Sequence, residues 1–191
     1  MSKSNTFIFL RHAETKKDPS VPAIDWELTK DGKVKVLELL DDPSFKIIDG
    51  VYSSTELKAK KTARPFVEKY EVPFLEVDAL KEVKRGEAYL TDEEFQKLKR
   101  EKLEQRDSAK DGGETANSAL IRFSKAMQEI DSNHSGETIL VVSHGTILAL
   151  YFSNLKKDFE NIYSYWKNMK FCAFGIIKDG KVQKDISSID S

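Results

Sequence analysis

Two of the chain's three histidines each follow a short apolar run, and they are the residues best suited to chemistry. Arg11 and His12 come directly after residues 6–10, and His144 comes after residues 138–143. Runs of aliphatic, β-branched and aromatic residues of this length are typical of strands buried inside a parallel sheet. Open α/β sheets bind ligands beyond the carboxyl ends of their strands. We therefore expect both histidines at one ligand-binding edge.

The residue types at these two positions favour phosphoryl chemistry. A histidine with a pKa near its reference value of about 6.5 is largely unprotonated at neutral pH, so His12 could attack phosphorus. Arg11 is always charged and its planar fork fits a phosphoryl group. His144 could be a second, cationic donor. Gly145 would let a backbone N–H approach at what we expect to be a helix N-terminus, which also attracts anions.

Two other interpretations remain open from these residues. Two histidines could bind a metal ion if a carboxylate such as Glu14 or Glu82 completed the site. Both histidines could also have a purely structural or interaction role, with their hydrogen bonds satisfied inside the protein.

Composition limits the class of protein. At 191 residues, the chain is expected to form one domain over 1–191 with a sizeable core. Its formal charge of −1 predicts no bulk attraction to nucleic acid or to an anionic membrane. Cys172 is the one cysteine, which excludes an internal disulfide and a multi-cysteine metal site. It lies in an apolar run, so we expect a packed thiol.

The distribution of apolar residues, at the start of the given sequence and along it, indicates the cellular location to expect. Residues 1–5 are polar and lead straight into the first predicted strand, without the apolar region of a signal peptide. No apolar run approaches the ~20 residues of a membrane span. We expect a cytoplasmic protein.

The order of elements predicts the fold. A helix begins after Thr29 as N-cap, with Val34, Leu37 and Leu40 as its apolar face, and Pro43 ends it. Ser54 or Thr55 could cap the next helix. Further strands are expected at 49–54 and 73–77, further helices at 56–70, 92–106, 114–131, 147–151 and 159–166, and a hairpin at 171–177 and 181–186, where Asp-Gly forms the turn. This order predicts an α/β three-layer sandwich, mostly parallel, with an antiparallel edge hairpin.

Residues 10–15, Leu-Arg-His-Ala-Glu-Thr, resemble the signature of the histidine phosphatase superfamily, the phosphoglycerate-mutase-like proteins. The family's usual sequence is Leu-Arg-His-Gly-Glu-Thr. Residues 52–63 resemble its Ser-Ser-Pro-Leu-x-Arg-Ala-x-Gln-Thr-Ala block. Other blocks match in order: Leu28-Thr29 with Gly32, Leu80 and Glu82 with Gly86, Gly113-Glu114-Thr115 with Arg122, and residues 141–145. The resemblance implies a phosphoglycerate-mutase-like fold.

The resemblance also implies residue roles. His12 would be the nucleophile that accepts the phosphoryl group, and Arg11 and His144 would bind its oxygens. Glu82 matches the family's general acid. An acid must carry a proton to act, so we expect burial, or negative charge such as the substrate's phosphate, to raise its pKa. The alternative for Glu82 is a solvated carboxylate beside neighbouring lysines.

Some positions depart from the family's pattern. Lys58 stands where the family has a second phosphate-binding arginine, which predicts weaker and less rigid phosphate binding. Lys61, one helical turn on, could assist it. Residues 16–19 lack the asparagine with which many members contact phosphate. Thr15 and Thr146 are the residues whose hydroxyls could contribute instead.

The segment at about 80–112 predicts a small lid. Only about 30 residues separate Glu82 from Gly112, whereas the family's mutases carry a long insertion that shields phosphohistidine from water. An open phosphoenzyme hydrolyses. We expect a metal-independent, histidine-acid-type phosphatase with a small phosphorylated substrate and no metal or organic cofactor. The alternatives are a phosphoglycerate mutase, a phosphohistidine-protein phosphatase and a non-catalytic phosphate-binding module.

Overall fold

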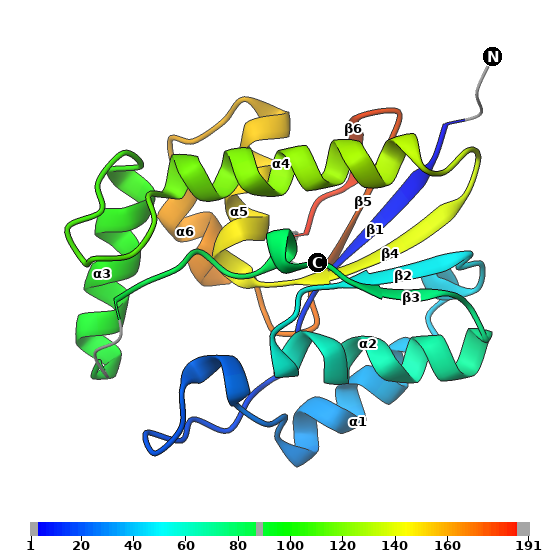
Figure 1. Cartoon of the computed structure of the whole chain (residues 1–191), viewed down its shortest axis with the longest axis horizontal. Coiled ribbons are helices and arrows are strands. Elements are labelled where there is room, and N and C mark those ends of the chain that lie inside the picture. The colour runs from blue at the N-terminus through cyan, green and yellow to red at the C-terminus, as the bar shows by residue number, and fades with distance from the viewer. Residues whose placement is uncertain (1–3, 87–89, 187–191) are drawn as a thin grey trace.

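A mixed β-sheet forms the centre of the protein in the computed structural model, which describes residues 4–86 and 90–186 (Figure 1). In this part of the chain the sheet has six strands in the order β3-β2-β4-β1-β5-β6. The first four run parallel and the last two are antiparallel to their neighbours, as predicted. The strands are β1 (Thr6–Arg11), β2 (Gly50–Ser53), β3 (Phe74–Glu76), β4 (Thr138–Ser143), β5 (Phe174–Lys178) and β6 (Lys181–Lys184).

Helices cover both faces of the sheet and complete the predicted three layers (Figure 1). On one face lie α1 (Lys30–Leu39) and α2 (Leu57–Tyr70). On the other are α4 (Ala116–Ser132), α5 (Gly145–Lys156) and α6 (Ile162–Asn168), while α3 (Asp92–Glu104) packs against α6. Short 3-10 helices lie at Ala23–Asp25, Pro43–Phe45 and Asp78–Leu80. No helix of the described residues has the length and apolar character needed to cross a bilayer.

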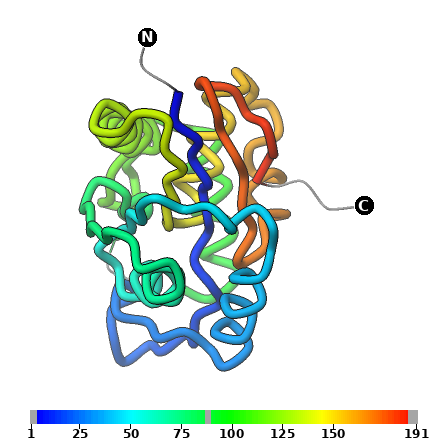
Figure 2. The backbone as a smooth tube through the Cα atoms, turned by 90° about the vertical axis from the view of Figure 1, so that its right-hand side faces the viewer, coloured from blue at the N-terminus to red at the C-terminus, as the bar shows by residue number. Residues whose placement is uncertain are grey.

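Strand β1 runs through the middle of the molecule and contributes to two hydrophobic cores (Figure 2). Successive side chains of a strand point to opposite faces. Accordingly, Phe7 and Phe9 join the core under α4 and α5, while Ile8 and Leu10 join the core under α1 and α2. This explains why residues 7–10 are apolar without interruption. The strand is therefore fixed on both faces up to the residue before Arg11.

Helix α1 buries a different face from the one predicted. Thr29 is the N-cap as expected, since its hydroxyl accepts a hydrogen bond from the Gly32 N–H at 2.9 Å. Val34 and Leu37, however, are each 55% exposed, and the buried residues are Gly32, Val36 and Leu39. A side chain at Gly32 would lie 2.6 Å from the Glu14 carbonyl oxygen. This close backbone approach sets the rotation of the helix.

The predicted caps of α2 are also wrong. The N-cap is Glu56, and neither Ser54 nor Thr55 fills that position. The Glu56 carboxylate makes no capping bond and contacts Lys58 instead. The Ser54 hydroxyl accepts a hydrogen bond from the Glu56 N–H at 3.2 Å. The first turn of α2 therefore presents its polar side chains to the edge of the sheet.

Helix α3, the main element of the expected lid, lies beyond the carboxyl ends of the parallel strands (Figure 1). A capping box between Thr91 and Glu94 begins it. The Tyr163 hydroxyl of α6 donates to Gln96 Oε1 at 2.9 Å, and Phe95 packs against Trp166 with ring centroids 6.1 Å apart. These contacts attach the helix to α6.

Lys102 of α3 makes a buried ion pair that we expect to stabilise the lid. Its side chain is 3% exposed, and its ammonium group lies 2.9 Å from Asp111 Oδ1 and 2.8 Å from the Glu114 carbonyl oxygen. Lys102→Met should lower the free energy of unfolding by about 3 kcal/mol, because it leaves a mostly buried carboxylate unpaired. Urea denaturation would measure this. Lys97→Met, at an exposed position of the same helix, should change it by less than about 0.5 kcal/mol. The prediction would be contradicted if Lys102→Met lowered the free energy of unfolding no more than Lys97→Met does.

Candidate active site

The two strand-end histidines lie together, as the sequence predicts. Strands β1 and β4 pair in parallel with Arg11 opposite Ser143, so the next residues of both strands leave the sheet at the same edge. The His12 and His144 rings have centroids 5.2 Å apart. The backbone N–H of His12 also donates to the Ser143 carbonyl oxygen at 2.9 Å. Strand register therefore brings together two residues 132 positions apart (144 − 12).

The ring of His12 is held in the orientation that a nucleophile needs. Its Nδ1 lies 2.8 Å from the Ala13 carbonyl oxygen. Because a carbonyl only accepts, we assign the hydrogen to Nδ1, and Nε2 keeps a free lone pair. Burial lowers the pKa of His12 well below 6.5, and the neighbouring His144, Arg11 and Lys58 side chains lower it further. The imidazole is therefore neutral at neutral pH.

Two nitrogens beside this ring are buried without a hydrogen-bond partner among the described residues: Arg11 Nε and His144 Nδ1. The Arg11 guanidinium is fixed by a bond from Nη1 to the Met169 carbonyl oxygen and lies 4.3 Å from the centre of the Phe171 ring. Burial lowers its pKa to about 10, so it is still charged at neutral pH. Buried polar atoms without partners are rare in proteins. These two nitrogens mark a candidate anion subsite next to the nucleophile.

His144 differs from the expected cationic donor. Its Nε2 lies 2.8 Å from Ser54 Oγ and 3.5 Å from Glu56 Oε1. Burial lowers the pKa of His144 to about 3, and Lys58, Arg11 and other cations act in the same direction against Glu82. The ring is therefore neutral in this structure. Nearby negative charge, such as a phosphoryl group, would favour the protonated form.

Glu82 is bound by the backbone at the start of α5. Its Oε1 accepts from the N–H groups of Val83 at 2.8 Å and Ile147 at 3.0 Å, and its Oε2 accepts from Thr146 at 3.0 Å. The N-cap residue of α5, His144, makes no side-chain capping bond. The Glu82 carboxylate thus satisfies free N–H groups of the helix, where negative charge is stabilised. It is not the solvated acid of the alternative interpretation.

The pKa of Glu82 is shifted in the direction opposite to the expectation. Burial by itself would raise it, but Lys99, His144 and the backbone N–H groups of Thr146 and Val83 together lower it below the ordinary value. The Lys99 ammonium group lies 3.9 Å from Glu82 Oε2. Glu82 is therefore ionised in this structure.

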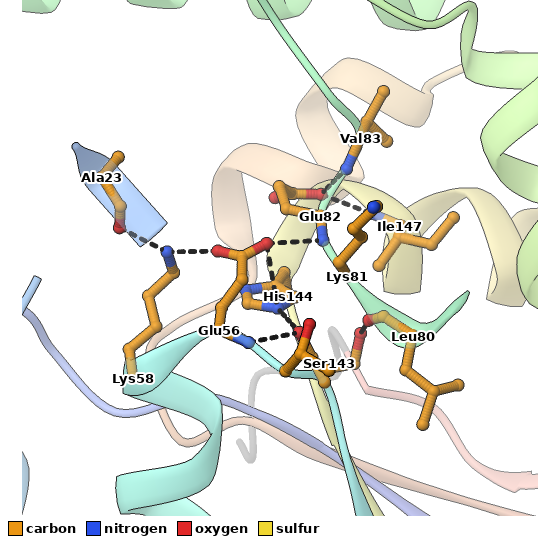
Figure 3. A network of polar contacts seen from close by, with 12 residues as sticks. Ala23, Glu56, Lys58, Leu80, Lys81, Glu82, Val83, Ser143, His144 and Ile147 are labelled. Atoms are coloured by element: carbon orange, nitrogen blue, oxygen red, sulfur yellow. Dashed lines mark hydrogen bonds and ion pairs between the residues drawn. The ribbon is translucent and has the colours of Figure 1, made fainter. Parts of the chain in front are cut away.

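Lys58 is already paired. Its Nζ lies 2.5 Å from Glu56 Oε2 and 2.8 Å from the Ala23 carbonyl oxygen (Figure 3). Lys61 is paired with Glu27 and does not assist it. The expected phosphate-binding lysine is thus held by a carboxylate that the sequence analysis did not single out.

The remaining predicted phosphate ligands have different surroundings. The Thr146 hydroxyl accepts from Lys99 Nζ at 2.7 Å. Thr15 pairs with Leu28 in an isolated bridge, and no described contact joins it to the histidines. A side chain at Gly145 would lie 3.0 Å from Arg11 Nε, so glycine allows the guanidinium to pack against α5.

Sequence reasoning missed Glu56, Lys99 and Phe171. Glu56 occupies the place of leucine in the family's block, so a charged residue there was a usable signal. Lys99 is one of many charged residues of α3, and nothing in the sequence distinguishes it. Phe171 packs against the His12 ring, with centroids 5.5 Å apart, from a segment with no matched motif. For the metal interpretation, no group of three or more potential metal-ligating His, Cys, Asp or Glu side chains occurs within residues 4–86 and 90–186.

The chain belongs to the histidine phosphatase superfamily (branch 1), whose family model matches residues 7–186. A curated relative, phosphoserine phosphatase 1 of Hydrogenobacter thermophilus, is 26% identical over 168 residues, covering 83% of this chain and 80% of that protein. Membership and this relative support a phosphatase.

Solved structures of other phosphatases share the fold. A mycobacterial glucosyl-3-phosphoglycerate phosphatase has a TM-score of 0.79 and 18% identity, covering 97% of this chain and 100% of that one. A mutant phosphoserine phosphatase of Entamoeba histolytica in complex with phosphoserine has a TM-score of 0.75 and 21% identity, covering 94% and 95%. The phosphoglycerate-mutase-like architecture is thereby confirmed.

Proposed function

We propose that this protein is a metal-independent phosphatase that hydrolyses small phosphomonoesters through a phosphohistidine on His12. The orientation of the His12 ring is the observation that carries the proposal. Its Nδ1 donates to the Ala13 carbonyl oxygen, so the lone pair of Nε2 is available, on a ring that packs against that of His144 and directly follows Arg11 in the chain. Arg11 would bind the transferring group throughout, and His144 would become a cation when that group arrives.

In the first step, Nε2 of His12 forms a bond to phosphorus while the bond from phosphorus to the ester oxygen breaks. Glu82 would give the departing oxygen its proton. Since Glu82 is ionised in this structure, it must first gain a proton, which the phosphomonoester monoanion can bring. The phosphoryl charge then raises the pKa of Glu82. In the second step water attacks phosphorus, Glu82 takes a proton from it, and phosphate leaves a free His12.

The test is phosphate release from a panel of phosphomonoesters in the presence of a chelator, with His12→Ala in parallel. Phosphoserine comes first in the panel because a curated relative is a phosphoserine phosphatase. Turnover that survives chelation and disappears in the variant would support the proposal. Turnover that requires a metal would contradict it. Isomerisation of a phosphoglycerate without phosphate release would indicate a mutase, and hydrolysis only of a phosphohistidine protein would indicate that narrower class of phosphatase. Phosphate binding without any turnover would indicate a non-catalytic module.

The pH dependence should respond to Lys99. This lysine lowers the pKa of Glu82, so Lys99→Met should raise that pKa and keep the acid form to higher pH. Because Glu82 gains its proton only with the bound substrate, the alkaline limb of kcat, measured at saturating substrate, should therefore move up by about 1 pH unit, the usual size of a charge effect at this range. A pH–rate profile with phosphoserine measures it. Lys97→Met, exposed on the same helix, should leave the limb in place. An unchanged or lowered limb for Lys99→Met would contradict the role of Glu82 as the acid.

A further inference from the structure

A buried carboxylate, Glu56, lies among the groups that would bind the phosphoryl oxygens. Its side chain is 10% exposed and that of its partner Lys58 is 9% exposed. One oxygen binds Lys58 Nζ, and the other accepts from the Glu82 N–H at 3.0 Å and lies 3.5 Å from His144 Nε2 (Figure 3). A single carboxylate thus contacts three groups at the edge of the site.

This placement opposes anion binding. A negative charge next to His144 repels a phosphoryl dianion, and the repulsion is little screened where water is excluded. Glu56 also offsets part of the charge of Lys58, which lowers the pKa of both histidines. Two of the three N–H donors of the ammonium group are taken by Glu56 and the Ala23 carbonyl oxygen, so a phosphoryl oxygen at the third would have to share the charge of Lys58 with the carboxylate.

We propose that Glu56 is a positioning residue that competes with phosphate for Lys58 and thereby keeps the affinity of the site for inorganic phosphate low. The inference rests on the proposed function in taking the region beside Arg11 and His144 as the phosphoryl subsite. Weak binding of phosphate would limit inhibition by the product. Glu56 itself exchanges no bond with the substrate and acts through Lys58 and His144.

The experiment is direct calorimetric titration with inorganic phosphate, which requires no turnover. Glu56→Gln keeps the size and the hydrogen-bonding oxygen of the side chain but removes its charge. We expect its Kd for phosphate to fall about tenfold, the order expected for removing one nearby charge from a poorly screened site. Glu56→Leu, with the residue type of the family's block, should move Kd in the same direction. Lys58→Met should raise Kd, and Glu56→Gln with Lys58→Met should return it to near the wild-type value.

Glu76→Gln is the matched control. Glu76 of β3 pairs at 3.3 Å with Lys60, which lies on α2 like Lys58, but this pair is much more exposed. The Kd of Glu76→Gln for phosphate should therefore stay within about twofold of wild type. Unchanged or weaker phosphate binding in both folded Glu56 variants would overturn the proposal, since a purely structural carboxylate would give that result. Absence of phosphate binding in wild type and variants alike would also overturn it. If Kd falls as expected but His12→Ala retains turnover, the phosphohistidine mechanism fails and the role of Glu56 stands.

Discussion

His12→Ala is expected to lower kcat for phosphomonoester hydrolysis by at least about 10⁴-fold, the order seen when a covalent nucleophile is removed. The loss should be this large because Nε2 itself forms the bond to phosphorus in the proposed first step. His144 is the one other imidazole of the site, and its Nε2 is engaged with Ser54. Phosphate release over a range of substrate concentrations measures the effect.

Two further measurements make this result specific. Rapid acid or alkali quenching of the wild type with a phosphate-labelled substrate should leave label on the protein that is lost in acid and kept in alkali, as expected of phosphohistidine. His134→Ala is the matched control. His134 lies at the opposite ends of the strands, half-buried against Tyr52 and Glu137, and its loss should leave kcat within about twofold. Label or turnover that persists in His12→Ala would show that another residue is the nucleophile.

The sequence predicts the sheet and the meeting of the two histidines because one physical rule governs both. Residues 7–10 and 139–142 are apolar on both faces, which only the interior of a covered sheet requires, and parallel pairing then brings the strand ends together. The hairpin of β5 and β6 is equally predictable from the sequence, because Asp179 and Gly180 both adopt the positive φ that its turn needs. These features can be predicted because each strand and the turn is recognisable from its own local pattern.

The rotation of α1 about its axis and the pairing of charged side chains depend on tertiary contacts, so the sequence alone does not predict them. Val34, Leu37 and Leu40 form as good a helical stripe as Val36 and Leu39 do with Gly32. The close approach of Gly32 to Glu14 selects between them, and this contact is long-range. Likewise, the pattern assigns Lys58 to phosphate, but whether its charge is free depends on Glu56. The pKa of Glu82 depends on Lys99, which reaches it from α3.

Glu82→Gln is expected to lower kcat/KM for phosphoserine by about 10²–10⁴-fold, the range for loss of a general acid. An alkoxide leaves phosphorus poorly unless it receives a proton, whereas a nitrophenolate is stable without one. The same variant should therefore lose far less activity, about tenfold or less, with p-nitrophenyl phosphate. Comparing kcat/KM for the two substrates measures the dependence on the leaving group.

This comparison separates proton donation from helix capping, because Glu82 also accepts three N–H groups around the start of α5. If capping were its whole contribution, displacement of the helix would disturb His144 and the anion subsite, and both substrates would lose activity equally. The glutamine variant keeps one carbonyl oxygen as acceptor and has no acid proton, so its fold should persist in thermal denaturation.

Glu114→Gln provides the control: this carboxylate accepts from the Lys84 N–H and pairs with Arg122 in the same part of the structure, away from the histidines. Glu114→Gln should leave unchanged the ratio of kcat/KM for phosphoserine to kcat/KM for p-nitrophenyl phosphate. An equal loss on both substrates in Glu82→Gln would assign Glu82 to positioning and require another acid for the leaving oxygen.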